Sequence, residues 1–444
     1  MEESVSVPLS GRGATETLTP PIGASNTRQR KPNTSEGKRA EGKRAEGKKK
    51  RVDRPRTTLL RGNFQLYDSH ENLKLFSEPN GGRKGAVFEA SRQVMRPFPR
   101  VKDVKVSEGA DPEVATGFKL TDADVSSMVF TDHHEGALIR VYYAAGSWQI
   151  STQRKIDAFK SRWSGPTSFG QMWVTAIEEQ VKCNSAFAAR VSGTTGNVLS
   201  SFFKTLDTNC QYLFVVRHNE ENRIVCDAPD SPMLYHVGTF SNGSILRVDN
   251  SANPPAADKR QTLDLPTPRV YTFPTFASLQ THVRGLDSTQ VSGCLGRTKD
   301  NKWYKFQNDT YLRKEKIRGN EPSLRFRYIQ VRLDGATVED LYQLFPAQAS
   351  VFDECEDNLY AIAKYIHKAY MDRFIRRQFV QLEREFFSVM RICHEWHKTD
   401  RQYNKVDLDK VIEVLNTRYD HVLNKMIRMF KKITRDESEK GGIN

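Results

Sequence analysis

The sequence lacks the features that mark exported, membrane-spanning and disulfide-bonded proteins. Its first thirty residues contain no apolar run, so we expect no signal peptide. No stretch approaches the ~18 consecutive apolar residues that a membrane-spanning helix requires. The six cysteines are scattered and form no C-x-x-C pair: Cys183, Cys210, Cys226, Cys294, Cys355 and Cys393. We therefore expect free thiols in an intracellular protein, nuclear or cytoplasmic, that is not secreted and has no membrane partner.

Signatures of several enzyme classes are also missing. The chain has no G-x-x-x-x-G-K-[ST] phosphate loop, which excludes a P-loop ATPase. It has no G-x-S-x-G and no H-E-x-x-H, the patterns of serine hydrolases and zinc proteases. The run C-H-E-W-H at 393–397 holds three candidate ligands close together, but it follows a helical pattern without a second ligand pair. We expect a packed helix face there and no metal site.

Positive charge is what the sequence has in excess. The formal net charge is +14, and residues 28–61 hold 14 Lys/Arg against 4 Asp/Glu, so +10 of it lies there. The pentapeptide E-G-K-R-A stands at 36–40 and 41–45, followed by E-G-K-K-K. Residues 1–60 have too few large apolar side chains to offset the entropy of ordering, so we expect a disordered basic tail. Its natural partner is a polyphosphate, because each neutralised phosphate releases counterions.

Three basic segments are candidates for contact with nucleic acid. The first is Lys48, Lys49, Lys50 and Arg51, which also fits a nuclear localisation signal. The second is the basic and aromatic run 151–163, whose Lys155, Lys160 and Arg162 suit a phosphate backbone. In the third, residues 373–391, arginines are interleaved with phenylalanines. An amphipathic helix with its arginines in water is the favoured interpretation there, and stacking with RNA or single strands is the alternative.

The pattern of apolar residues predicts an α+β fold with a largely antiparallel sheet. Short strands broken by turns are expected between residues 61 and 335, at 138–143, 148–151, 212–216, 224–226 and 324–332. A helix is expected at 169–181 and a loop at 250–269. After Gly335 the apolar residues follow helical spacing. We therefore expect a folded α+β domain at 61–335, an all-helical domain at 336–435 and a flexible end at 436–444.

Four segments of the α+β part, in order and rough spacing, resemble a known enzyme domain. They are G-R-K-G at 82–85 with M-R-P at 95–97, H-H-E-G at 133–136, N-R-I-V at 222–225, and W-Y-K-F-Q at 303–307. This ordered set resembles the nucleotidyltransferase domain of phage-type RNA ligases, the group typified by phage T4 RNA ligase 1. That family also has an all-helical C-terminal domain. The resemblance implies a ligase-like domain at 61–335.

The resemblance implies a chemistry and a set of residues. In that family a lysine takes AMP from ATP as a phosphoramidate and passes it to an RNA 5′-phosphate, with divalent metal neutralising phosphate charge. By this analogy ATP and Mg (or Mn) are the cofactors if the site is active, with none otherwise. The implied catalytic residues are His133, Glu135 and Lys305. The implied cofactor-binding residues are Arg83, Lys84, Arg96, Arg140, Asn222 and Arg223.

The chain departs from the family pattern at the chemical positions. His133 stands where the nucleophilic lysine belongs, and Glu135 replaces the motif's aspartate. A glutamate expected near Phe214 or Val215 is absent, the E-G motif becomes Ser292-Gly293, and a second lysine becomes Gln307. An imidazole can itself form a phosphoramidate, so a histidine nucleophile is one alternative. A shifted register, with Lys119, Lys155 or Lys160 as nucleophile, is another.

Two functions therefore stay open at the level of the sequence. One is an RNA-ligase-like nucleotidyltransferase acting on nucleic-acid ends through a nucleotidylated intermediate. The other is a catalytically lapsed ligase fold that serves as a nucleic-acid-binding or structural protein. Both take nucleic acid as partner, with RNA favoured over DNA. A long basic tail on such a body suggests a large DNA virus as the source.

Overall fold

The structure is a computed structural model that describes residues 65–77, 84–97, 100–106, 120–192, 197–241, 244–246, 263–300 and 302–441. The chain divides into two units, 1–56 and 57–444, and all described residues belong to the second. Several predictions lie outside the described residues: those for the basic tail, including Lys48, Lys49, Lys50 and Arg51, and those for Arg83 and Lys119.

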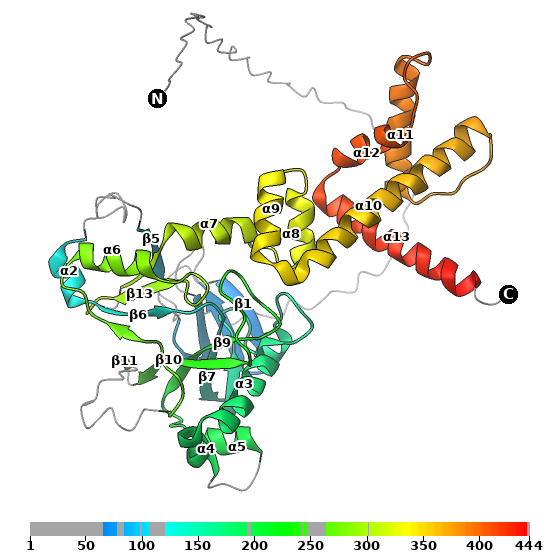
Figure 1. Ribbon diagram of the computed structural model, residues 1–444. Coiled ribbons are helices and arrows are strands. Elements are labelled where there is room, and N and C mark those ends of the chain that lie inside the picture. Colours follow the sequence, from blue (N-terminus) through cyan, green and yellow to red (C-terminus); the bar gives the residue numbers. More distant parts are fainter. Residues whose placement is uncertain are drawn as a thin grey trace, which may run out of the picture. The chain divides into compact units, whose positions relative to one another are not determined.

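Three sheets form the α+β part (Figure 1). The first has the order β1-β2-β3-β4: Gln65–His70, Leu73–Ser77, Lys84–Glu89 and Arg92–Met95. The second has the order β11-β10-β9-β7-β8: Ser244–Leu246, Met233–Ser241, Gln211–Arg217, Ala137–Ala144 and Ser147–Ser151. The third has the order β12-β6-β13-β14-β5: Val270–Tyr271, Val129–His133, Gly293–Arg297, Trp303–Gln307 and Val101–Lys105. All pairs are antiparallel except β14 with β5, which confirms the predicted antiparallel character.

The helices of this part cover the two five-stranded sheets. Helix α3 (Phe169–Cys183) begins at a capping box of Ser168 and Gln171, and it packs on β7, β9 and β10. Helices α4 (Ser185–Ser192) and α5 (Val198–Lys204) follow it, and a short 3₁₀ turn, η1 (Ala158–Lys160), precedes it. Helices α2 (Asp122–Ser127) and α6 (Phe276–Gly285) share a second core with β6, β13 and β14. Each sheet thus buries its own apolar face.

A helical region follows from residue 309 to 441. Its α-helices are α7 (Asp309–Arg318), α8 (Leu324–Val331), α9 (Gly335–Leu344), α10 (Ala349–Tyr370), α11 (Arg384–Thr399), α12 (Leu408–Asn416) and α13 (Asp420–Gly441). A 3₁₀ turn, η3 (Pro346–Gln348), precedes α10, and a π-helical turn, η4 (Met371–Ile375), ends it. One apolar core joins them, from Ile317 to Ile427. The predicted helical C-terminal part is confirmed, and its core begins before residue 336. No described helix is long and apolar enough to cross a membrane.

Two predicted strands are wrong. Residues 224–226 form bends, and the strand that pairs with β9 is β10. The alternation of apolar and basic side chains predicts a strand at 324–332, yet these residues form α8, which Ser323 caps at its N-terminus. Tyr328 and Ile329 are buried in the helical core. The helical spacing of apolar residues and packing against α10 and α13 outweigh the local alternation.

Two glycines permit close contacts between strands. Gly136 and Gly293 have φ of +151° and +147°. A Cβ on Gly293 would collide with the carbonyl oxygen of Phe306, and one on Gly136 with the carbonyl oxygen of Val216. Gly285, in contrast, has open space where a Cβ would stand. Gly136 belongs to the H-H-E-G motif and Gly293 to the Ser292-Gly293 pair, so both motifs have a steric reason to contain glycine.

We predict that Gly293→Ala lowers the free energy of unfolding by about 3 kcal/mol, because a backbone carbonyl cannot move aside for the new methyl group. The control Gly285→Ala changes it by less than about 1 kcal/mol. Urea denaturation followed by tryptophan fluorescence measures both. Equal stability of the two variants would contradict the assigned close contact.

Candidate functional site

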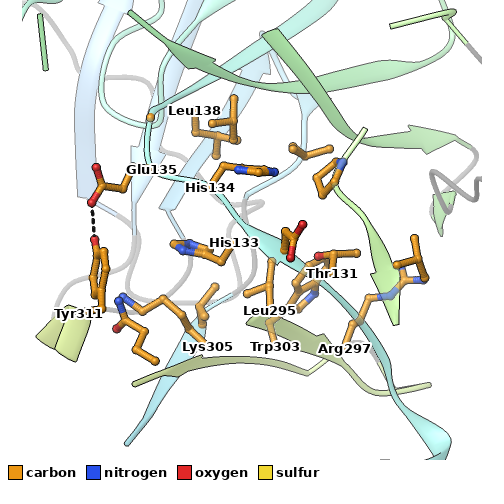
Figure 2. A pocket seen from close by; sticks show the side chains of 18 of the residues that line it. Thr131, His133, His134, Glu135, Leu138, Leu295, Arg297, Trp303, Lys305 and Tyr311 are labelled. Atoms are coloured by element: carbon orange, nitrogen blue, oxygen red, sulfur yellow. Dashed lines mark hydrogen bonds between the residues drawn. The ribbon is translucent and has the colours of Figure 1, made fainter. Parts of the chain in front are cut away.

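A cavity of about 530 Å³ is lined by residues from both five-stranded sheets (Figure 2). Strands β5, β6, β13 and β14 contribute from one sheet, β7, β9 and β10 from the other, and α7 adds two side chains. Its walls are largely apolar: Val101, Val129, Leu138, Val215, Val237, Val270 and Leu295. Its ionisable residues are Asp132, His133, His134, Glu135, Arg297, Lys305, Tyr311 and Glu315. This size suits one small organic ligand.

His133, at the end of β6, has a defined hydrogen-bonding state. Its Nδ1 lies 2.5 Å from the Ser292 hydroxyl oxygen, which lies 2.5 Å from the backbone carbonyl oxygen of His133. The carbonyl can only accept, so the single hydroxyl proton of Ser292 is donated to it. Nδ1 must then donate to the hydroxyl, which leaves Nε2 with the lone pair. Burial, with the charge of Lys305 nearby, lowers the pKa of His133 to about 3, so the ring is neutral.

His134 faces the cavity and stacks on a tyrosine. Its ring lies 4.0 Å from that of Tyr235, with 10° between the planes. Burial lowers the pKa of His134 to about 4. The neighbouring Asp132 is buried and accepts hydrogen bonds from Arg269 Nε and the Tyr271 hydroxyl, each at 3.1 Å. The two histidines therefore contribute no positive charge to the cavity at neutral pH.

Glu135 is a buried carboxylate that joins three parts of the chain. Its oxygens accept the backbone N–H of Val225 at 2.8 Å, that of Ile224 at 3.4 Å and the Tyr311 hydroxyl at 2.7 Å. Burial and the adjacent carboxylate raise the pKa of Tyr311, so this hydroxyl keeps its proton. Glu135 thereby fixes the β6–β7 corner to the 224–225 segment and to α7.

Lys305 lines the cavity from β14 and is already paired. Its Nζ lies 3.0 Å from Asp103 on β5, its partner in the parallel register. Glu315 lies near enough for the charge of Lys305 to act on it, although burial dominates and raises the pKa of Glu315. Of the described lysines, Lys305 is the one that lines this cavity. Lys155 and Lys160 instead pair with Asp68 and Asp157, at 3.5 and 3.2 Å.

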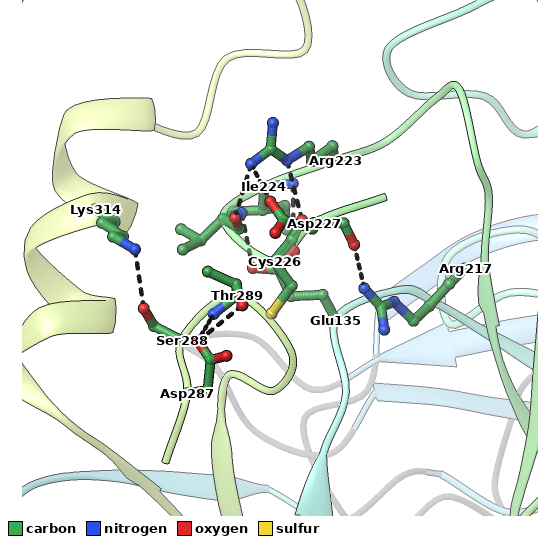
Figure 3. Close-up of polar contacts among 11 residues, drawn as sticks. Glu135, Arg217, Arg223, Ile224, Cys226, Asp227, Asp287, Ser288, Thr289 and Lys314 are labelled. Carbon is green, nitrogen blue, oxygen red and sulfur yellow. Dashed lines mark hydrogen bonds and ion pairs between the residues drawn. The ribbon is translucent and has the colours of Figure 1, made fainter. Parts of the chain in front are cut away.

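Arg223 and Asn222 of the N-R-I-V segment lie outside the cavity lining. Figure 3 shows Arg223 beside Cys226 and Asp227. The Arg223 guanidinium donates to the Cys226 carbonyl at 3.0 Å and pairs with Asp227 at 2.8 Å. It also lies over the ring of Phe345, 4.9 Å from its centre. Asn222, with φ of +66°, exchanges hydrogen bonds with Ser164. Their assignment to cofactor binding therefore stays a prediction.

The other predicted cofactor-binding cations that the structure describes, Lys84, Arg96 and Arg140, also lie outside the cavity lining. Arg140 is fully buried and donates to the carbonyl oxygens of Gly85 and Thr152. Lys84 is exposed at the start of β3, and Arg96 follows β4, where its backbone N–H donates to Gln211. The structure thus brings His133, Glu135 and Lys305 to one cavity and leaves the predicted arginines elsewhere. Arg162 is exposed in the same segment as Lys155 and Lys160.

Sequence reasoning missed five of the ionisable side chains that line the cavity: Asp132, His134, Arg297, Tyr311 and Glu315. It also missed Asp103, which pairs with Lys305. Glu315 had a usable signal, because it lies four residues after Tyr311 and so shares its face of α7. Asp103 had none, because its pairing with Lys305 depends on the parallel register of two strands about 200 residues apart in the chain.

No protein-family model matches the chain. Three curated viral proteins are similar in sequence. The chain is 23% identical over 358 residues to a protein named immediate-early protein ICP-46 homolog from Invertebrate iridescent virus 6, covering 77% of this chain and 75% of that one. It is 27% identical over 241 residues to the homolog from Invertebrate iridescent virus 3, covering 54% and 48%. It is 26% identical over 206 residues to immediate-early protein ICP-46 from Frog virus 3, covering 45% and 49%.

Three solved structures that are similar to this chain, each at a TM-score below 0.4, are ligases. An archaeal ATP-dependent RNA ligase has a TM-score of 0.36 and 12% identity, covering 66% of this chain and 73% of that one. A putative ATP-dependent DNA ligase from Aquifex aeolicus has a TM-score of 0.34 and 9% identity, covering 83% and 77%. A Naegleria gruberi RNA ligase in complex with ATP and Mn has a TM-score of 0.29 and 10% identity, covering 57% and 97%.

We predict that the protein loses stability as the pH falls from about 6.5 towards 4, because His133, His134 and His236 have folded pKa values of about 3, 4 and 4. In that window the unfolded chain binds more protons than the folded one, at up to about 1.4 kcal/mol per pH unit for each histidine. Urea denaturation between pH 7 and 5 measures the slope.

The matched variants are His133→Asn and His421→Asn. Asparagine at 133 retains a donor for Ser292 but does not titrate, so the slope becomes shallower. The control His421 is exposed in α13, and its replacement leaves the slope as in the wild type. A slope that is unchanged in His133→Asn would refute the assigned neutral, half-buried imidazole.

Proposed function

We propose that the protein is a nucleic-acid-binding protein whose two-sheet cavity, arranged like that of phage-type RNA ligases, does not carry out their lysine chemistry. One observation supports this above all others. Where the ligase pattern requires a lysine and two carboxylates, the cavity region holds neutral His133, apolar Val215 and Ser292, and the first and last of these hydrogen-bond to each other. The Nδ1 of His133 and the hydroxyl of Ser292 are thus engaged within the protein.

The charges of the cavity support the same conclusion. Two cations line it, Arg297 and Lys305, against three carboxylates, Asp132, Glu135 and Glu315. Lys305 is also compensated by Asp103. A nucleoside triphosphate, with several negative charges, would find no net positive charge among the described side chains that line the cavity. A nucleoside or a free base fits the apolar walls better.

The described residues do not fit the metal that ligase chemistry uses. No group of three His, Cys, Asp or Glu side chains in the described ranges is placed to hold an ion. Asp132 and Glu135 are each engaged by two or more hydrogen-bond donors. We therefore derive no catalytic step through Mg or Mn.

Nucleic-acid binding is supported by where the charge lies. Residues 28–61 carry +10 of the net +14, and Lys155, Lys160 and Arg162 add an exposed basic segment to the folded part. We propose RNA as the preferred partner. The similar proteins are named as immediate-early proteins of iridescent viruses and Frog virus 3, so we further propose that this protein acts inside a virus-infected cell.

A second function, nucleotidyl transfer through histidine, is favoured by the hydrogen bonding of His133. With Nδ1 donating to Ser292, the Nε2 lone pair is available to attack an α-phosphate. The N–P bond would form as the P–O bond to pyrophosphate breaks, with pyrophosphate as the leaving group. Transfer to a nucleic-acid 5′-phosphate would then release the imidazole.

One labelling experiment separates the two functions. The full-length protein is incubated with α-labelled ATP or GTP and magnesium or manganese, then denatured and resolved by electrophoresis. We predict that no label stays on the protein with either nucleotide, because the site lacks the lysine and the phosphate-neutralising charge. Label that persists in the wild type and in His134→Ala, but not in His133→Ala, would establish the histidine route instead.

The basic tail gives a separate prediction for binding. We predict that replacing Lys48, Lys49, Lys50 and Arg51 by glutamine weakens binding to a single-stranded RNA and flattens its salt dependence. The slope of log K against log salt falls by about 0.7 for each phosphate that the variant no longer neutralises. Fluorescence anisotropy across a range of salt concentrations measures it. The control replaces Lys182 and Lys398, two exposed lysines that each pair with a glutamate of the same helix. Equal slopes in both variants would place binding outside the tail.

A further inference from the structure

The connection between α10 and α11 exposes an aromatic side chain among arginines. Helix α10 ends in the π-helical turn Met371–Ile375, and residues 376–383 then run without regular structure to the start of α11. Phe379, in this connection, is 88% exposed. This is the most exposed of the large apolar side chains in the part of the chain that the structure describes. In Figure 1 the connection lies in the orange part of the ribbon.

The backbone on both sides of Phe379 is fixed to the helix. The N–H of Gln378 donates to the carbonyl of Asp372 at 2.9 Å, and the Arg373 guanidinium donates to the carbonyl of Val380 at 3.4 Å. Arg373 itself lies over the ring of Phe387, 5.3 Å from its centre. The segment is thus held in place, and the exposure of Phe379 is a property of an anchored conformation.

The side chains of this segment alternate between the core and the surface. Val380 and Leu382 pack against the helical core, whereas Phe379 and Gln381 are exposed. Such alternation is expected of an extended segment lying on a core. Phe379 therefore points outward because Val380, the next residue, points inward and packs against the helical core.

The arginines near Phe379 divide into two kinds. Arg373 donates a hydrogen bond to the Val380 carbonyl, and Arg376 pairs with Asp372 at 2.6 Å. Arg377 is exposed, has φ of +59°, and has no hydrogen bond or ion pair with the described residues. Arg384, which is also exposed, begins α11. An uncompensated cation thus lies two residues from an exposed ring, and the segment 371–384 carries four arginines against two acidic residues.

We propose that this connection is a contact site for single-stranded nucleic acid, in which one base stacks on Phe379 and Arg377 and Arg384 contact the backbone phosphates. This inference rests on the proposed nucleic-acid binding and assigns part of it to a surface on the helical region. A ring that an anchored backbone exposes to water suits an unpaired base, whose own face is free. Positive charge beside it favours a polyanion over an apolar protein surface.

The test measures binding of the full-length protein to a short fluorescent single-stranded RNA and to the duplex of the same sequence. We expect Phe379→Leu, which retains apolar bulk but loses the ring, to weaken single-strand binding about fivefold or more. Phe379→Trp retains the affinity. Arg377→Gln weakens single-strand binding and lowers its salt slope by about 0.7. Duplex binding is the same in all these variants.

The matched control is Ile375→Ala. Ile375, at the end of the preceding π-helical turn, is 61% exposed but has no ring, so its replacement leaves RNA binding unchanged. Wild-type RNA affinity in Phe379→Leu would overturn the proposal. Equal losses of RNA affinity in Phe379→Leu and Ile375→Ala would also overturn it, because they would indicate a general apolar contact and no stacking on the ring. If only the variant with Lys48, Lys49, Lys50 and Arg51 replaced loses RNA affinity, nucleic-acid binding by the protein is supported and the site at Phe379 is refuted. If the wild type binds neither RNA, both proposals fail.

Discussion

One buried carboxylate holds the candidate site together. Glu135 stands at the corner between β6 and β7, the point where the chain passes from one five-stranded sheet to the other. By accepting two backbone N–H groups and the Tyr311 hydroxyl, it joins that corner to the 224–225 segment and to α7. Leaving a buried carboxylate without hydrogen-bond donors costs free energy, so Glu135 favours keeping the β6–β7 corner, the 224–225 segment and α7 in contact. The cavity walls keep their relative places through this group.

The helical region is attached to the sheets by cations and rings as well. Phe345, at the end of α9, lies 4.9 Å from the guanidinium of Arg223 and 5.9 Å from that of Arg318. Arg318 in turn lies over Trp163, 5.2 Å from its centre, and burial lowers its pKa to about 10 without discharging it. Both arginines thus act within the protein, through hydrogen bonds to backbone carbonyls and contacts with the faces of rings.

How much of this could be predicted depends on whether the signal is local. The 137–151 hairpin has its Ala-Ala-Gly turn, and α3 has its Ser168–Gln171 capping box, so short-range chemistry specifies both. The strand prediction at 324–332 fails because apolar-basic alternation mimics a strand, and only the distant core of α10 and α13 selects the helix. The prediction of the cavity is incomplete for a similar reason. The order of the motifs places His133 and Lys305 at one site, but Asp103, which neutralises Lys305, comes from a parallel neighbouring strand that no local pattern reveals.

The motif residues that this chain shares with the ligase pattern can be separated from those in which it departs from that pattern. Glu135, which keeps a carboxylate where the motif has an aspartate, fixes three segments. Arg223 and Asn222 hold the 222–227 loop, and Gly136 and Gly293 allow strands to approach. Each has a structural contact that explains its residue type without any reaction. The departures fall at His133, Val215 and Ser292, where the pattern calls for groups that act on phosphate. Retention of the first set therefore gives no support to catalysis, because packing and hydrogen bonding alone require it. His133 and Val215 line one cavity together with a further departure, Gln307, and Ser292 hydrogen-bonds to His133. This grouping agrees with the proposal that the cavity does not carry out lysine chemistry.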